Sequence, residues 1–253
     1  MEYNLNNKIA ERKTKDVYKE DGKTIKLFVE NYSKADILNE ALNQARVEEA
    51  TDLYMPKLLE VTKIGNRWAL ISEHIEGTPL DVLMEQHPEK IDEYLDTFVK
   101  IQLTMLSKQV PLLNRLKEKY RRKINSATNI NNNIKYELLQ RLEGMKSHTK
   151  LCHGDYNPSN IIINEKGEYF IIDWSHATQG NASADVARTY LLFSIQGKKD
   201  LAEKYLDLYV EKSGTEKSYI QRWIPIVAAA QMSKGKPEEQ EFLHSWVDII
   251  DYE

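Results

Sequence analysis

The spacing of hydrophobic and polar residues predicts strands near the start of this chain and helices through most of the remainder. Residues 16–29 (DVYKEDGKTIKLFV) alternate on both sides of Asp21-Gly22, a pair that favours the positive φ angles of a hairpin turn. In the second strand of this hairpin Ile25 and Leu27 share one face, because successive side chains of a strand point to opposite faces. Lys26 therefore lies on the other face.

A helix is predicted after this hairpin. Apolar residues recur with a period of 3.6 between residues 37 and 45, which is typical of an amphipathic helix. Ser33 or Asp36 is suited to cap its N-terminus, because a short polar side chain can accept a hydrogen bond from the first free backbone N–H groups. Glu40 lies on this helix.

Strand character returns over residues 67–73 and breaks at Gly77 and Pro79, where we place a boundary between two lobes. The first lobe, residues 1–75, is expected to be a small antiparallel sheet with one helix. The second, residues 76–253, has mostly helical patterns, interrupted by the Asn-rich stretch 125–133 that we interpret as a polar loop. Strands followed by helices indicate an α+β fold.

A second hairpin interrupts the helical patterns. LCHGDYNPSNIIIN (residues 151–164) runs into a series of isoleucines, and EYFIIDW (residues 168–174) supplies the partner strand after a turn at Gly167. The polar residues that precede the isoleucines are costly to desolvate, so they require a partner or a function. This motif is therefore expected on a loop that enters a hairpin.

Composition excludes several classes of function. The 253 residues include 35 basic and 39 acidic side chains, a formal net charge of −4 that provides no field for binding nucleic acid. Cys152 is the single cysteine and forms no internal disulfide, which fits a reducing compartment. No apolar stretch approaches the ~20 residues of a membrane-spanning helix, and the N-terminus has no obvious export signal. We expect a cytoplasmic protein without a nucleic-acid or membrane partner.

Three polar residues around the second hairpin indicate phosphoryl transfer. Asp155 and Asn160 are five residues apart and precede the first strand of the hairpin, whereas Asp173 ends the partner strand. The hairpin is therefore expected to bring all three to the same end. Carboxylate and amide oxygens form a site suited to Mg²⁺, which is commonly held by one or two protein ligands together with substrate phosphates. A carboxylate left free of the metal can accept the proton of an attacking hydroxyl.

These residues form part of a longer pattern. HGDYNPSN (residues 153–160) matches H-G-D-x-x-x-x-N, IIDW contains the aspartate that follows, and together they resemble the aminoglycoside phosphotransferase and choline kinase group of the protein-kinase-like fold. In the expected order, IKLF resembles the strand that carries the nucleotide lysine, and SEHIEG resembles the hinge that meets adenine. The resemblance covers residues 8 to about 190 and implies a two-lobed kinase-like fold with ATP and Mg²⁺ as cofactors.

The resemblance implies roles for individual residues on the nucleotide side. Lys26, steadied by its ion-pair partner Glu40, would contact the α and β phosphates of ATP. The peptide groups of Glu73 and Ile75 would bind the adenine edge.

It implies further roles around the second hairpin. Asn160 and Asp173 would hold Mg²⁺, and Asp155 would orient or deprotonate the acceptor hydroxyl. His153 and Asp185 would support the catalytic loop. The implied reaction is phosphorylation of a hydroxyl on a small molecule, with an aminoglycoside or another amino-bearing compound among the candidates.

The chain departs from this family at the loop that covers the phosphates. AERKTKDVY (residues 10–18) contains no glycine, so Lys13, Thr14 and Lys15 offer side-chain donors in place of close backbone amides. Two alternatives remain open: a pseudokinase that binds nucleotide as a scaffold without catalysis, and a metal-dependent phosphoesterase that uses Asp155 and Asp173 as bridging ligands.

The segment between Asp173 and Asp185 has only eleven residues, too few for a peptide-binding activation segment, so the substrate is expected to be small. KEKYRRKI (residues 117–124) is interpreted as a solvated helix face, because glutamate is interleaved with the basic residues, with a phosphate or nucleic-acid patch as the alternative. The acidic C-terminal part is interpreted as a solvated face, with attraction of a cationic amino sugar as the alternative. Its acidic residues are Glu238, Glu239, Glu241, Asp248, Asp251 and Glu253.

Overall fold

A computed structural model describes residues 3–247 of the chain. Its internal contacts divide it into two compact units, each of which is discontinuous in sequence. Unit 1 comprises Met1–Pro88 and Pro158–His176, and unit 2 comprises Glu89–Asn157 and Ala177–Glu253. Residues 158–176 thus pack with the N-terminal part of the chain, whereas the lobe limits 1–75 and 76–253 stay a prediction.

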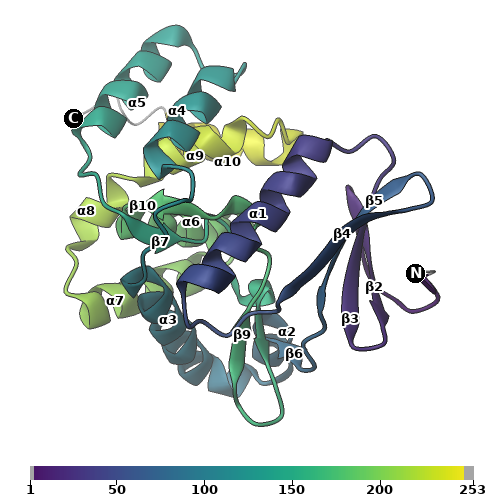
Figure 1. Cartoon of the computed structure of the whole chain (residues 1–253). Helices are drawn as coiled ribbons and strands as arrows, with labels where there is room; N and C mark the ends of the chain where they lie inside the picture. The colour runs from purple at the N-terminus through teal and green to yellow at the C-terminus, as the bar shows by residue number, and fades with distance from the viewer. Residues whose placement is uncertain (1–2, 248–253) are drawn as a thin grey trace. The chain divides into compact units, whose positions relative to one another are not determined.

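Unit 1 is built on a five-stranded antiparallel sheet in the order β1-β2-β3-β5-β4, of which β2, β3, β4 and β5 are labelled in Figure 1. The predicted hairpin is β2 and β3, and its turn residues Asp21 and Gly22 have φ angles of 44° and 71°. Arg67 braces the sheet by donating from Nε to the carbonyl of Phe28 at 2.7 Å. The strands are β1 (Lys8–Arg12), β2 (Lys15–Glu20), β3 (Lys23–Phe28), β4 (Leu58–Ile64) and β5 (Arg67–Glu73).

Helix α1 (Lys34–Ala50) lies against β4 and β5 of this sheet. Ser33 is its N-cap, since its side chain accepts a hydrogen bond from the N–H of Asp36. Hydrophobic residues are buried on both sides of the sheet, because Ile25 and Leu27 pack in one cluster while Phe28 packs with α1 in another. The strand alternation that produces this division also turns Lys26 toward the α1 side.

The second part of unit 1 is a small antiparallel sheet in the order β6-β8-β9, in which the predicted isoleucine strand is β8. Ile161 is fully buried there, and the N–H of Ile171 donates to the carbonyl of Tyr54, which ties this sheet to the N-terminal residues. The elements are β6 (Thr78–Pro79), α2 (Leu80–Gln86), the 3₁₀ turn η2 (Pro158–Asn160), β8 (Ile161–Ile163), β9 (Tyr169–Ile171) and the 3₁₀ turn η3 (Trp174–His176).

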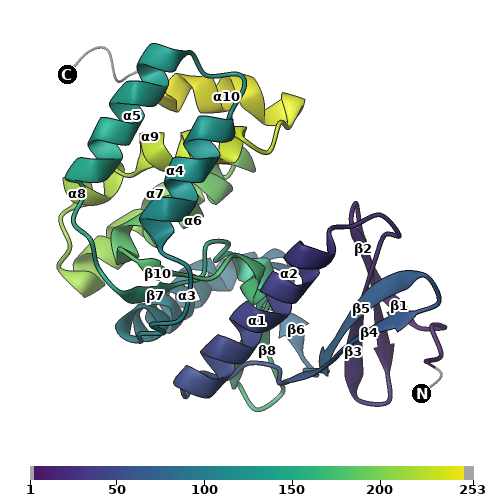
Figure 2. The ribbon, with the colours of Figure 1, turned by 45° about the horizontal axis from the view of Figure 1, so that its top comes forward.

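Unit 2 is mostly helical and is centred on α9, which is buried along its whole length (Figure 2). Helices α4, α5, α6 and α10 all pack against α9. A two-stranded antiparallel sheet of β7 and β10 completes the unit. The elements are α3 (Ile91–Ser107), α4 (Leu116–Ser126), α5 (Asn132–Gly144), β7 (Lys150–Cys152), β10 (Thr178–Gly180), α6 (Ala182–Ile195), α7 (Lys199–Ser213), α8 (Lys217–Gln221), α9 (Ile224–Met232) and α10 (Pro237–Val247), with the 3₁₀ turn η1 (Pro88–Lys90) at the junction of the units.

The predicted α+β class is confirmed, and one predicted boundary is wrong. The Asn-rich stretch 125–133 is not a loop throughout, because α4 continues to Ser126 and α5 begins at Asn132. Asn131 caps α5 by accepting a hydrogen bond from the N–H of Ile134 at 2.9 Å. Asparagine is frequent at helix N-termini for this reason. Within residues 3–247 no helix is long and apolar enough to cross a membrane.

Gly180 of β10 tests the packing between this small sheet and α4. A Cβ atom at this position would lie 2.4 Å from the Cβ of Leu116. A Cβ atom is bonded directly to the backbone, so a change of side-chain rotamer cannot relieve this clash. We expect Gly180→Ala to lower the free energy of unfolding by about 1–3 kcal/mol, the usual cost of overpacking. Gly144→Ala is the matched control, since nothing lies within 4 Å of its added methyl group. Urea unfolding of both variants checks this, and equal stability would contradict it.

Candidate active site

A largely buried lysine in unit 1 is held by two carboxylates from different elements. The Nζ atom of Lys26 on β3 lies 2.7 Å from Glu40 Oε1 on α1 and 3.4 Å from Asp173 Oδ1, two residues after β9. Burial alone would lower the pKa of this ammonium group, but the charges of Asp173 and Glu40 outweigh burial and hold the pKa above its ordinary value. Lys26 is therefore a permanent cation.

A second lysine joins the same group. Lys15 begins β2, directly after the Lys13-Thr14 turn of the glycine-free segment, and its Nζ lies 3.4 Å from Asp173 Oδ2 and 3.6 Å from Glu40 Oε1. Its ammonium also lies 5.7 Å from the ring centroid of Phe28, which favours a cation. The segment that lacks glycine thus supplies a side-chain cation to the cluster formed by Lys15, Lys26, Glu40 and Asp173, here called the ion cluster.

The backbone at Asp173 is strained, with a φ of 64°. A non-glycine residue adopts this left-handed conformation only where its surroundings fix it, and such residues are frequent at functional sites. The next residues are fixed by α1 and by the core. Asn43 Nδ2 donates to the carbonyl of Ser175 at 3.2 Å, and the buried Trp174 donates from Nε1 to the carbonyl of Ile171. These contacts direct the carboxylate of Asp173 into the ion cluster.

Asn160 lies beside Asp173 through a backbone contact, because its carbonyl accepts the N–H of Ile172 at 3.0 Å. The side-chain donors at these two positions are a carboxylate and an amide oxygen. This hard-oxygen pair fits Mg²⁺, which accepts few protein ligands and completes its shell with phosphates and water. The arrangement matches the expected ligand types, and the use of these residues as metal ligands stays a prediction.

The two expected hinge residues differ in their surroundings. The N–H of Glu73, the last residue of β5, already donates to the carbonyl of Lys57 at 3.0 Å. Ile75 is half-buried and lines an open cavity of about 880 Å³ together with Gly77 and Ile163. Binding of adenine by these peptide groups stays a prediction, and the N–H of Glu73 is engaged within the fold.

In unit 2, helix α6 fixes the loop of residues 153–156. Asp185 in its first turn accepts the N–H of Gly154 at 2.6 Å, and Thr189 Oγ1 donates to the carbonyl of Tyr156 at 2.8 Å. Burial raises the pKa of Asp185, and hydrogen bonds from the backbone N–H groups of Gly154 and His153 oppose this. Between these two contacts lies Asp155, whose Oδ1 is 3.6 Å from Arg188 Nη2.

His153 is fully buried and accepts the N–H of Asp155 on Nδ1 at 3.3 Å. The side chain of Tyr156 anchors the other end of the loop, since its hydroxyl donates to the carbonyl of Phe98 at 2.7 Å and its ring stacks on Phe98. The carboxylate of Asp155 is therefore presented on a backbone that is tied at both sides. Such a fixed carboxylate is suited to orient a hydroxyl or accept its proton.

The model of the phosphotransferase enzyme family matches residues 20–218, which is well over half of the chain and includes all of these positions except Lys15. The chain belongs to the phosphotransferase enzyme family. No relative is detected among curated protein sequences.

Solved structures show the fold of this phosphotransferase. The aminoglycoside phosphotransferase APH(4)-Ia superposes with a TM-score of 0.71 at 14% identity, over 96% of this chain and 91% of that one. Choline kinase LicA from Streptococcus pneumoniae gives 0.66 at 14% identity, over 98% and 93%. An aminoglycoside-3'-phosphotransferase of type VIII gives 0.65 at 12% identity, over 86% and 88%. The predicted resemblance and the kinase-like fold are confirmed.

Sequence reasoning missed a group of basic residues in unit 2 of this phosphotransferase. Burial and the charges of Lys123, Arg188 and Lys234 lower the pKa of Lys119 to about 7, and burial and Arg188 lower the pKa of Lys123 to about 8. Both lysines are partly buried on α4. The stretch 117–124 was interpreted as solvated throughout, and that interpretation is wrong for these two. The sequence contained one signal of this burial: Lys119 and Lys123 are four residues apart, and each precedes one of the apolar residues Tyr120 and Ile124 on the same side of the helix.

The lowered pKa of Lys119 predicts a pH-dependent stability. Its ordinary pKa is about 10.4, so between pH 7 and pH 10 the unfolded chain binds a proton that the native side chain lacks, and stability rises with pH. Below pH 7 both states are protonated and the cost of burying the charge is complete. Lys119→Gln removes this cost. The difference in the free energy of unfolding between the variant and the parent protein is therefore expected to favour the variant by roughly 1–2 kcal/mol more at pH 6 than at pH 9.5.

Urea unfolding at the two pH values measures this difference. Arg122→Gln is the matched control, because Arg122 is exposed on the same helix and loses the same charge. Its effect on stability is expected to be the same at both pH values. A benefit of Lys119→Gln that stays constant or grows with pH would contradict the assignment.

Proposed function

We propose that this phosphotransferase transfers the γ-phosphoryl group of ATP, used as its Mg²⁺ complex, to a hydroxyl group of a small molecule. The observation that carries the proposal is the ion cluster, in which a permanently charged lysine and a strained aspartate are held together by α1 and η3. Charged groups are costly to desolvate, so their concentration here favours a functional role such as the binding of nucleotide phosphates. A thermostable mutant of APH(4)-Ia forms a crystalline ternary complex with AMP-PNP and hygromycin B, which supports nucleotide use.

In this proposal each residue of the ion cluster has a task. Lys26 binds the α and β phosphates and is oriented by Glu40, and Lys15 adds a second cation where related kinases use glycine amides. Asn160 and Asp173 hold Mg²⁺, which when bound neutralises charge on the phosphates. The backbone of Ile75 binds the adenine edge, with Glu73 contributing its carbonyl.

The acceptor side of the proposal uses unit 2. Asp155 orients the hydroxyl of the acceptor and takes its proton as the phosphoryl group transfers. His153 and Asp185 are positioning residues, because they fix the backbone on either side of that carboxylate. The short segment between Asp173 and Asp185 favours a small acceptor over a peptide.

Nucleotide binding is tested by thermal unfolding with ATP, with and without Mg²⁺. At about 100 times its Kd a ligand adds about 2.7 kcal/mol to stability, which raises the Tm of a chain this size by roughly 5–10 °C. We expect a Mg²⁺-dependent shift in the parent protein and its loss in Asp173→Asn. Asparagine tolerates the positive φ, so this variant removes the charge and keeps the backbone.

Glu30→Gln is the control for this experiment, because Glu30 is an exposed acid of unit 1 outside the ion cluster. It is expected to keep the full shift. A parent protein that shows no shift at millimolar ATP would refute nucleotide use.

Catalysis is tested separately with Asp155→Asn. Loss of the general base is expected to lower the turnover number by roughly 10²–10⁴-fold while the ATP-dependent Tm shift is retained. ADP release in the presence of an accepted hydroxyl compound is the measurement. Asp92→Asn, a change at an exposed acid of the same unit, is expected to have no effect.

The glycine-free turn at Lys13-Thr14 favours one alternative, a pseudokinase scaffold that binds nucleotide without catalysis. The same two measurements separate it from the proposal. A Mg²⁺-dependent ATP shift with no ADP release from any hydroxyl compound, in parent and Asp155→Asn alike, would establish the scaffold.

A further inference from the structure

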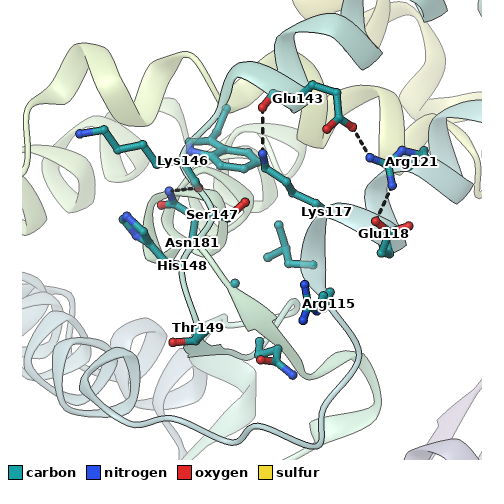
Figure 3. A pocket seen from close by; sticks show the side chains of 14 residues that line it. Arg115, Lys117, Glu118, Arg121, Glu143, Lys146, Ser147, His148, Thr149 and Asn181 are labelled. Carbon is teal, nitrogen blue, oxygen red and sulfur yellow. Dashed lines mark hydrogen bonds and ion pairs between the residues drawn. The ribbon is translucent and has the colours of Figure 1, made fainter.

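The basic residues of α4 fall into two groups with different environments. Lys117 and Arg121 line a cavity of about 270 Å³ in unit 2, where both side chains have partners within the protein (Figure 3). Arg121 forms ion pairs with Glu118 and Glu143, and Lys117 donates to the carbonyl of Glu143 at 3.0 Å. On this side of the helix Arg121 is paired with two carboxylates, whereas Lys117 has a neutral acceptor.

Lys119 and Lys123 point away from that cavity, because residues two positions apart on a helix are separated by about 200°. They are one turn apart and therefore neighbours on the helix surface, where two like charges repel. Helix α4 packs against α9, and α6 packs against α9 as well (Figure 2). This packing brings both lysines into the electrostatic field of Arg188 on α6.

Arg188 is buried, and its guanidinium is shared between Asp155 and a neutral group. Its Nη1 donates to Gln231 Oε1 at 2.7 Å, near the C-terminal end of α9. Lys234 follows at that end of α9, because its N–H donates to the carbonyl of Gln231, and it lies in the field of both Arg188 and Asp155. Lys119, Lys123, Arg188 and Lys234 together are called the basic cluster below.

The basic cluster has more positive charge than the nearby acids can balance. The carboxylates whose charge favours its lysines are Asp185, which acts on Lys119, and Asp155, which acts on Lys123 and Lys234. Glu239 is engaged elsewhere, by Lys236 and Gln231. Among residues 3–247 neither Lys123 nor Lys234 forms an ion pair. Burial and mutual repulsion disfavour full protonation of the three lysines beside Arg188, and a bound anion would favour the protonated form.

We propose that the acceptor of this phosphotransferase is itself an anion, a small hydroxyl compound with a carboxylate or phosphate group that binds the basic cluster beside Asp155. This inference rests on the proposed function, because it takes Asp155 as the group that receives the acceptor hydroxyl. The anionic group fixes the molecule through charge-assisted hydrogen bonds and leaves its hydroxyl toward Asp155. The same charges repel cationic amino sugars, so the cluster selects against them.

The expectation of an amino-bearing acceptor loses its structural support on this view. That expectation came from the family resemblance, and the one residue-based support for it was the alternative interpretation of the acidic C-terminal part, where Glu239 is buried and bonded to Lys236 and Gln231. The other acids of this part that the structure describes, Glu238 and Glu241, are exposed. Asp248, Asp251 and Glu253 lie outside the described residues.

Sulfate is a suitable probe of the basic cluster. Its Kd is measured by calorimetry on protein saturated with Mg²⁺ and AMP-PNP, so that the phosphate-binding part of the nucleotide site is occupied. Each lost charge-assisted hydrogen bond is expected to weaken sulfate by roughly 10-fold or more, so the double variant Lys119→Gln/Lys123→Gln should lose most of its binding. Arg122→Gln, on the exposed side of α4, is expected to bind sulfate as the parent does.

Gluconate, glucose and glucosamine extend the test to hydroxyl compounds, because they share a six-carbon polyol skeleton and carry negative, zero and positive charge. Binding to the same AMP-PNP complex is expected to decrease in that order, and the preference for gluconate should disappear in the double variant. Equal affinities, or tighter binding of glucosamine, would overturn the inference.

The failures of the two proposals are distinguishable. Absence of AMP-PNP binding to the parent protein would overturn the proposed function and this inference with it. Intact AMP-PNP binding with sulfate affinity unchanged in the double variant would overturn this inference alone. Weaker AMP-PNP binding with unchanged sulfate binding would assign the lysines to the nucleotide, which also overturns it.

Discussion

The burial of the Lys26 charge is the constraint on which unit 1 depends. A buried ammonium is stable only with carboxylate partners, and these come from a helix and from a segment more than a hundred residues later in the chain. The sheet, α1 and the β8–β9 hairpin must therefore adopt one arrangement together. The positive φ of Asp173 shows that these contacts outweigh the conformational preference of its backbone, since a non-glycine residue is strained in this conformation.

In unit 2 the carboxylate of Asp155 also depends on contacts from another element. One helix, α6, contacts the backbone before and after Asp155 and also presents Arg188 to its carboxylate. Residues 151–164 join a polar loop to a series of isoleucines because the two parts pack against different elements. The polar part is fixed by α6, while Ile161 anchors Asn160 by burial in β8. Adjacent residues in the sequence thus belong to different packing units.

Local patterns were sufficient to predict the elements and the chemical residue types. Alternation predicted the face of Lys26, helical spacing predicted α1 with Glu40, and the H-G-D-x-x-x-x-N motif predicted the loop of Asp155. Contacts between distant segments were not predictable in this way. The entry of Lys15 into the ion cluster depends on the turn geometry at Lys13-Thr14, and the basic cluster depends on the packing of α4 and α6 against α9. The spacing of Tyr120 and Ile124 indicates only that Lys119 and Lys123 border the buried face of α4, and the packing of other helices decides whether they are enclosed.

The discontinuity of unit 1 also affects how the chain is made. A nascent chain releases β1 to β5 and α1 long before the ribosome has added residues 158–176, and at about 5–20 residues per second the delay is roughly 5–20 s. During that interval Lys26 has Glu40 as its partner but lacks Asp173, and α1 lacks the η3 turn against which it packs. Unit 1 can therefore be completed only after residues 89–157 of unit 2 have been synthesised. Until then unit 1 is incomplete and is a possible substrate for chaperones.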